Sequence, residues 1–193
     1  GAGARVILAD EDFRFGGRLL GDRREIAGLP GHDWADRAVA ELQALPNVTL
    51  MPRSTVFGAF DGNEFGILQR VSDHLAVPEA HQPRQRMWRV VAKRAVLASG
   101  TIERSIAFGG NDRPGIMMAG AARTYANRFG AAPAREMAVF TASDDGWRTV
   151  ADLAARGLHV AAVIDPRSEI PAAHRETAAR AGARLVSGAS VLG

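Results

Sequence analysis

Cysteine is absent from this 193-residue chain, and its absence excludes several kinds of chemistry at once. Without thiols there are no disulfides, thiolate zinc sites, iron–sulfur clusters or cysteine nucleophiles. Long apolar runs are also missing, since none approaches the about 18 to 20 residues that span a bilayer. No basic segment followed by an apolar run and a cleavage site stands near the start. We therefore expect a cytoplasmic protein with no membrane partner.

Lysine and aromatic residues are scarce as well. Lys93 is the one lysine among 24 cationic residues, and aromatic residues make up 6% of the chain. The arginines are scattered among acids, and the net charge is only +3. Nucleic-acid binding favours a basic stripe with aromatic side chains for stacking, so we expect no nucleic-acid partner. The five histidines are dispersed without the spacing of metal ligands, so we expect no metal site.

Hydrophobic residues make up 47% of the chain, which is enough for a substantial core. Short apolar runs predict strands, and apolar residues at helical spacing predict helices. Asp61-Gly62-Asn63 predicts a hairpin between two of the strands, and Asp33 is expected to cap a helix. Within residues 1–132 the expected strands are 6–9, 48–51, 55–60, 65–71, 87–91 and 95–98, the expected helices are 33–45 and 117–129, and the expected loops are 13–31, 76–86 and 101–118.

Residues 133–193 alternate between strand and helix patterns. The expected strands are 137–140, 159–164 and 184–186, and the expected helices are 145–156 and 171–181. This βαβαβ order implies a parallel sheet. We therefore predict an α/β protein of the two-dinucleotide-binding, Rossmann-like type: an FAD/NAD(P)-binding-like domain over residues 1–132 with an antiparallel hairpin insertion, and a smaller βαβαβ unit over residues 133–193.

The acidic end of the first predicted strand is the strongest candidate site. In a dinucleotide-binding fold the second strand ends in a carboxylate that accepts hydrogen bonds from the adenosine ribose. Asp10 has that place, Glu11 follows it, and Gly16-Gly17 comes six residues after Asp10. The alternative is a polar strand end that leads into a loop. No glycine-rich pyrophosphate loop precedes this strand, so the first domain is expected to lack its first strand and that loop.

Two later strand ends are weaker candidates. Ala98-Ser99-Gly100 ends an apolar strand in small residues, which lets the backbone approach a nucleotide, although an ordinary turn explains it equally well. Residues 141–146 have the position of a phosphate-binding turn. There Asp144 and Asp145 would occupy the positive end of the helix dipole and repel a pyrophosphate, so helix capping is the favoured interpretation. We assign no catalytic residue, since Ser99 lacks a nucleophile-elbow context.

Several segments, taken in order, resemble the α subunit of heterotetrameric sarcosine oxidase. The resemblance covers most of residues 2–166, and the hairpin and the Asn-Asp-Arg-Pro-Gly stretch are its most specific parts. The segments are residues 6–11 with Gly16-Gly17, residues 55–63, residues 83–88, residues 93–104 and residues 111–117.

The resemblance implies an oxidative demethylase complex. In that family sarcosine, oxygen, water and tetrahydrofolate give glycine, hydrogen peroxide and methylene-tetrahydrofolate. The α subunit carries a non-catalytic NAD, the β subunit carries the FAD that oxidises the amine, and FMN held covalently by β lies between the two. The β, γ and δ subunits would be the partners. This chain would be a fragment without the C-terminal folate domain, and it is expected to be inactive alone.

The resemblance also implies a set of cofactor contacts. The expected cofactor-binding residues are Asp10 and Glu11 at the ribose, Val56 against the adenine, Arg18 after the double glycine, and Gly17, Ala98, Ser99 and Gly100. The related α subunits of opine, proline or cyanide-forming amine dehydrogenases are an alternative, although residues 111–115 favour the sarcosine family. A structural module that holds partner subunits and catalyses nothing is a further alternative.

Overall fold

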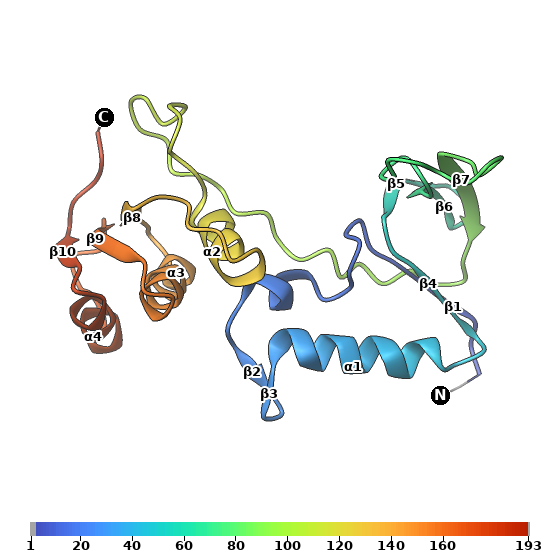
Figure 1. Ribbon diagram of the computed structural model, residues 1–193, viewed down its shortest axis with the longest axis horizontal. Coiled ribbons are helices and arrows are strands. Elements are labelled where there is room, and N and C mark those ends of the chain that lie inside the picture. The colour runs from blue at the N-terminus through green and yellow to red at the C-terminus, as the bar shows by residue number, and fades with distance from the viewer. Residues whose placement is uncertain (1–2, 193) are drawn as a thin grey trace. The chain divides into compact units, whose positions relative to one another are not determined.

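The computed structural model describes residues 3–192, and its contacts divide them into two compact units (Figure 1). Unit 1 contains the residues up to Gly17 and Ile26–Gly100. Unit 2 contains Arg18–Glu25 and the residues from Thr101 onward. The predicted domain boundary at 132/133 stays a prediction. The units differ from it because Arg18–Glu25 and the residues after Gly100 pack with later parts of the chain.

A βαβ element forms the first part of unit 1. Strand β1, Val6–Ala9, pairs in parallel with β4, Val48–Met51, and helix α1, Gly31–Gln43, connects them. Both strands were expected, and both are confirmed. The helix begins directly after Pro30, so the predicted cap at Asp33 is wrong. Asp33 lies instead in the first turn, where its charge suits the positive end of the helix dipole.

The segment expected as a loop between β1 and α1 contains short elements. They are the 3-10 helix η1, Gly17–Gly21, and the strands β2, Glu25–Ile26, and β3, Leu29–Pro30. β2 and β3 pair with each other. Sequence patterns miss β2 and β3 because two residues are too few to show a period.

A three-stranded antiparallel sheet completes unit 1. Its strands are β5, Ser54–Phe60, β6, Glu64–Arg70, and β7, Gln85–Val91, in the order β5-β6-β7. The turn between β5 and β6 holds Gly62 at φ +76° and Asn63 at φ +57°. These are left-handed conformations that glycine and asparagine tolerate best. The predicted hairpin is therefore confirmed.

The strand predicted at residues 95–98 is wrong. No described strand pairs with it, and residues 93–107 are all exposed. Val96 and Leu97 are 89% and 88% exposed. Their apolar character suggested a buried strand, but a strand also needs a neighbour for its backbone hydrogen bonds, and no sheet edge in the described residues supplies one.

Unit 2 contains a three-stranded parallel sheet in the order β10-β9-β8. Its strands are β8, Glu136–Phe140, β9, His159–Asp165, and β10, Arg184–Ser187, and its connecting helices are α3, Asp144–Ala155, and α4, Ala172–Ala181. Each connection steps to the next strand in the same direction. Because such crossovers are right-handed, both helices cover the same face of the sheet. The predicted βαβαβ order is confirmed.

Helix α2, Ala119–Arg128, packs against α3 and begins at a carboxylate from outside the helix. Glu103 accepts hydrogen bonds from the amides of Ala119, at 3.1 Å, and Gly120, at 2.8 Å. These amides have no partner within the helix, and an anion is favourable at that end. Glu103 thereby ties the irregular residues before α2 to unit 2.

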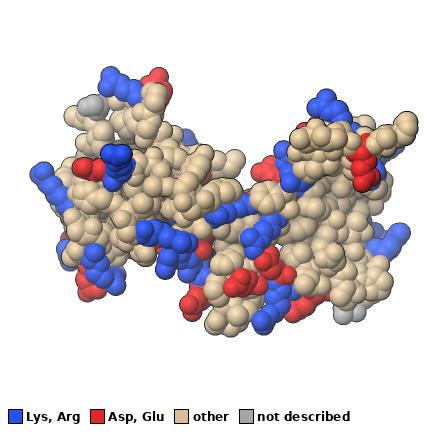
Figure 2. Space-filling view, viewed as in Figure 1, with Lys and Arg blue, Asp and Glu red and all other residues tan. Residues whose placement is uncertain are grey.

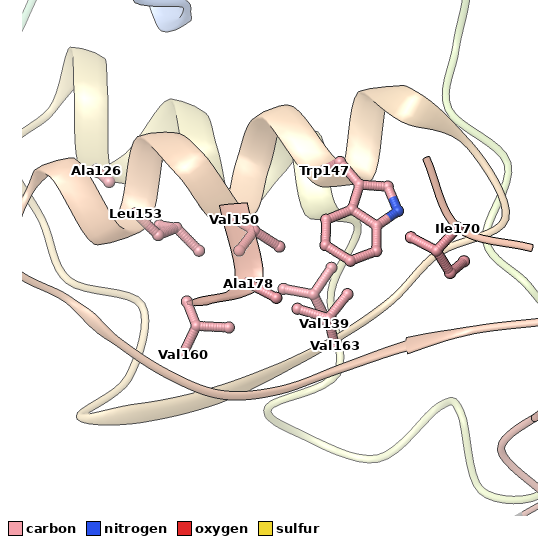
Figure 3. Close-up of a cluster of buried hydrophobic side chains, with 9 residues drawn as sticks. All are labelled: Ala126, Val139, Trp147, Val150, Leu153, Val160, Val163, Ile170 and Ala178. Atoms are coloured by element: carbon pink, nitrogen blue, oxygen red, sulfur yellow. The ribbon is translucent and has the colours of Figure 1, made fainter. Parts of the chain in front are cut away.

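The core of unit 2 lies between α3 and the sheet (Figure 3). Trp147, Val150 and Leu153 lie on one face of α3 and are at most 1% exposed. They face Val160 and Val163 of β9, which are fully buried. Burial of each such side chain contributes about 1.5 to 3 kcal/mol. The cluster is completed by Ala126, Val139, Ile170 and Ala178.

Candidate functional site

Asp10 directly follows β1, and its backbone continues the pairing of that strand. Its amide donates to the Met51 carbonyl at 3.0 Å, and its carbonyl accepts from the Ser54 amide at 2.8 Å. The carboxylate is half-buried, and its Oδ1 accepts a hydrogen bond from the Asp12 amide at 2.9 Å. No described donor bonds to Oδ2. One carboxylate oxygen is therefore free at the strand end, as a ribose contact requires.

Glu11 and Val56 lie close to this strand end. The side chain of Glu11 is exposed, and its carbonyl accepts from Arg70 Nη2 at 2.6 Å. Because Ser54 opens β5 and bonds to Asp10, the first residues of β5 lie beside the acidic loop. Val56, on the same strand, is 48% exposed. The structure thus brings Asp10, Glu11 and the start of β5 together and leaves an apolar side chain open nearby.

Gly17 and Arg18 stand where the chain passes from one unit to the other. Gly17 has a φ of +51° and opens η1. Arg18 belongs to unit 2, where its Nη2 lies 2.6 Å from both carboxylate oxygens of Asp145. The guanidinium of Arg18 is therefore committed to an ion pair within unit 2. Asp10 belongs to unit 1.

Ala98, Ser99 and Gly100 do not form the strand end that the sequence suggested. All three are exposed, and Gly100 has a φ of +68°. They lie in the extended stretch that leads out of unit 1. The structure does not bring them to Asp10 through any described hydrogen bond.

A cavity of about 550 Å³ lies in unit 1 between the loop after Asp10, α1 and β4. Phe13, Phe15 and Val39 give it an apolar lining, and Arg14 lies at the same cavity with Asp36. Arg14 Nε donates to Asp36 Oδ1 at 3.0 Å. That hydrogen bond raises the pKa of Arg14 and lowers the pKa of Asp36. The volume of this cavity is within the range of small-molecule sites. The sequence did not predict the cavity, because only the fold brings Asp36 of α1 next to Arg14.

The carboxyl edge of the sheet in unit 2 is filled by side chains of the unit itself. Asp144 begins α3, and its Oδ1 lies 2.9 Å from both Arg167 Nη1 and His174 Nε2. These hydrogen bonds hold the pKa of Asp144 below its ordinary value. His174 also stacks on Trp147, with the ring centroids 4.9 Å apart.

Asp145, the next residue, binds several arginines. Beyond Arg18, Arg123 Nη2 lies 3.3 Å and Arg148 Nη1 3.7 Å from its carboxylate. Burial raises the pKa of Asp145, but the hydrogen bond from Arg18 and the charge of Arg123 outweigh it, and the pKa is lowered. Two ionised carboxylates at a helix N-terminus do not fit a pyrophosphate. The expected capping is a charge effect only, because the N-cap Ser143 makes no side-chain capping hydrogen bond.

Charges of both signs alternate over the face shown in Figure 2, where Lys and Arg are blue and Asp and Glu are red. Within residues 3–192, no three His, Asp or Glu side chains gather in a way that could hold a metal ion. In the same residues, no helix is long and apolar enough to cross a membrane.

No family model matches the sequence. Curated relatives do match it over nearly its whole length. It is 48% identical over 192 residues to the sarcosine oxidase subunit alpha of Rhizobium meliloti (strain 1021). It is 44% identical over 197 residues to the same subunit of Corynebacterium sp. (strain P-1). The chain is homologous to a segment of the sarcosine oxidase α subunit. The resemblance expected from the sequence motifs is confirmed.

The matches to sarcosine oxidase α subunits cover 100% and 99% of this chain but only 19% and 20% of those relatives. Solved structures agree on the fold. An L-proline dehydrogenase from P. horikoshii covers 86% of this chain with a TM-score of 0.65 and 22% identity, over 32% of its own length. An engineered water-forming NADPH oxidase bound to NADPH covers 98% with a TM-score of 0.60 and 14% identity, over 42% of its length. The Rossmann-like fold is therefore confirmed.

Proposed function

We propose that this chain belongs to the nucleotide-binding region of a sarcosine oxidase α subunit and that Asp10 holds the adenosine ribose of NAD. The observation that carries the proposal is the free Oδ2 of Asp10 at the end of a parallel strand. The 48% identity to a sarcosine oxidase α subunit supports the choice of complex.

The residues around Asp10 fit an adenosine. A ribose hydroxyl donates to a carboxylate oxygen, and such charge-assisted bonds are worth about 1.5 to 3 kcal/mol each. Glu11 adds a second negative charge beside Asp10. Two carboxylates would repel the 2′-phosphate of NADP, so the site favours NAD. The exposed Val56 offers an apolar contact for the adenine.

In the complex that we propose, this chain binds and orients the dinucleotide and does no chemistry on the amine. Oxidation of sarcosine to glycine belongs to the FAD of the β subunit, with FMN at the α/β interface and tetrahydrofolate accepting the one-carbon unit. The β, γ and δ subunits are the proposed partners, and the cytoplasm is the proposed location. In unit 2, the carboxylates of Asp144 and Asp145 favour a structural role over nucleotide binding.

The test is Asp10→Ala in the full-length α subunit, with NAD content measured after purification. We expect NAD affinity to fall about tenfold to a hundredfold, because the free oxygen of Asp10 bonds to the ribose from a partly solvated position. The matched control is Asp61→Ala, which removes an exposed carboxylate from the hairpin turn. Unchanged NAD content in the Asp10 variant, or equal binding of NADP by the unmutated protein, would overturn the ribose assignment.

A further inference from the structure

A second cavity, of about 430 Å³, lies wholly within unit 2, between the segment at residues 22–24, helix α2 and helix α3. Charged side chains line it, and arginines outnumber acids. The lining residues are Asp22, Arg23, Arg24, Arg123, Arg148 and Asp152. Nothing in the nucleotide proposal uses this cavity.

Arg123 is the buried arginine of this cavity. It comes from α2 and is only 3% exposed. Its Nη2 faces Asp145 at 3.3 Å, near the limit of a hydrogen bond. Its Nη1 is buried and has no hydrogen-bond partner in the described residues. A buried donor without a partner costs free energy, and a bound acceptor would remove that cost.

The carboxylates of the cavity are already engaged. Asp22 accepts from the backbone amide of Arg24, and from its side chain, at 2.7 Å each. Asp152 accepts from Asn127 Nδ2 at 2.9 Å, and burial raises its pKa. Among the described residues neither acid forms a hydrogen bond with Arg123, although the charge of Arg123 lowers the pKa of both. The free hydrogen-bonding capacity of the cavity therefore belongs to its arginines.

We propose that this cavity binds a phosphoryl group, with the guanidinium of Arg123 as the inner donor and Arg23 and Arg148 at the exposed rim. A guanidinium presents donors in a planar fork that matches a tetrahedral oxyanion. Arg23 is exposed, and the side chain of Arg148 is 60% exposed, so both can turn toward an incoming anion.

Inorganic phosphate added to the full chain tests the proposal. Melting temperature is followed against phosphate concentration up to about 20 mM, with sodium chloride at matched ionic strength as the reference, because a ligand that binds only the folded state raises stability with concentration. Line broadening of the phosphorus resonance gives an independent Kd. A parallel titration with AMP distinguishes two sources of the phosphoryl group. Equal Kd values for phosphate and AMP indicate a site for free phosphate. A lower Kd for AMP indicates a site for a nucleotide phosphate that binds through the same arginines.

Variants separate binding from structural support. Arg148→Gln and Arg23→Gln remove exposed charges and are expected to keep the fold, with phosphate binding about twofold to fivefold weaker in each. Arg123→Lys keeps the charge that faces Asp145 and removes the fork, and it is expected to weaken binding at least about tenfold. Arg180→Gln, which changes an exposed arginine of α4, is the matched control and should bind like the unmutated chain.

Three results would overturn the phosphoryl site. The first is a phosphate titration that does not differ from sodium chloride. The second is an equal phosphate Kd in the unmutated chain, Arg148→Gln and Arg23→Gln. The third is an equal loss of binding in Arg180→Gln. If Arg123→Lys does not fold, the two rim variants still decide the question.

Discussion

Asp165 ends β9 with a carboxylate that is fully buried and hydrogen-bonded by two side chains. Trp147 Nε1 donates to Oδ2 at 2.8 Å, and Arg167 Nη2 donates to the same oxygen at 2.8 Å. Burial by itself raises the pKa of Asp165, but the hydrogen bonds from Arg167 and Trp147 outweigh it and lower the pKa. Because the folded pKa lies below the unfolded value, the charged form stabilises the fold above about pH 4.

We therefore expect Asp165→Asn to lower the free energy of unfolding of unit 2 by about 2 to 4 kcal/mol at pH 7, because the buried charge that binds Arg167 and Trp147 is lost and Arg167 keeps only its ion pair with Asp144. The stabilisation from Asp165 is lost as pH falls through its folded pKa, so the difference between variant and unmutated chain should shrink in acid. Chemical denaturation at pH 7 and below pH 4 measures both effects. Asp112→Asn, at an exposed aspartate, is the control, and an equal loss there would contradict the prediction.

Single residues were predictable from the sequence where a local pattern fixes them. The place of Asp10 follows from the short apolar run before it, and the two acids at the start of α3 follow from the strand-to-helix order. No local sequence pattern predicted the burial of Asp165 or Arg123. A buried charge becomes visible only when residues far apart in the chain pack around it, as Trp147 does around Asp165.

At the scale of an element, the hairpin between β5 and β6 depends on two left-handed residues. Gly62 at φ +76° has no steric penalty there, whereas alanine would cost about 1 to 2 kcal/mol. Asn63 at φ +57° is already a tolerated exception. We expect Gly62→Ala to destabilise unit 1 by about that amount and Asn63→Gly to change its stability by less than about 0.5 kcal/mol. Thermal unfolding compares them, and equal losses would mean that conformation does not limit this turn.

Elements were predictable in proportion to their length and to the presence of a partner. The helices and the paired strands of both units were expected close to their observed bounds. The short strands β2 and β3 were not predicted, because two residues are too few to show a hydrophobic period. The strand predicted at residues 95–98 was wrong for a different reason. Apolar character predicts burial, whereas a strand also needs a free sheet edge elsewhere in the fold to pair with.

At the scale of the whole molecule, the chain spans 19% and 20% of the sarcosine oxidase α subunits that it matches. We assign none of its residues to amine oxidation. The purified chain is therefore expected to produce no hydrogen peroxide from sarcosine above the background without protein. A peroxide assay with the complete heterotetramer as positive control measures this. Peroxide formation in proportion to the amount of purified chain would contradict the division of labour that we propose.

The similarity to sarcosine oxidase α subunits was predictable from sequence motifs because they are specific and keep their order, whereas the grouping of the chain into units was not. Arg18–Glu25 joins residues from Thr101 onward through contacts such as the ion pair of Arg18 with Asp145. The local sequence at Arg18 does not predict that Asp145 is its partner. Long-range pairing of this kind is decided by packing and charge together.

The placement of the three tryptophans has a practical consequence. Trp147 is 1% exposed in unit 2, whereas Trp34 and Trp88 are 38% and 36% exposed in unit 1. Iodide quenches exposed indoles and not buried ones. It therefore quenches much of the tryptophan fluorescence of unit 1 and little of that of unit 2. The emission that remains comes from Trp147, beside His174 and Asp165. The intrinsic fluorescence of the chain can thus follow the unfolding of each unit separately, without an added label.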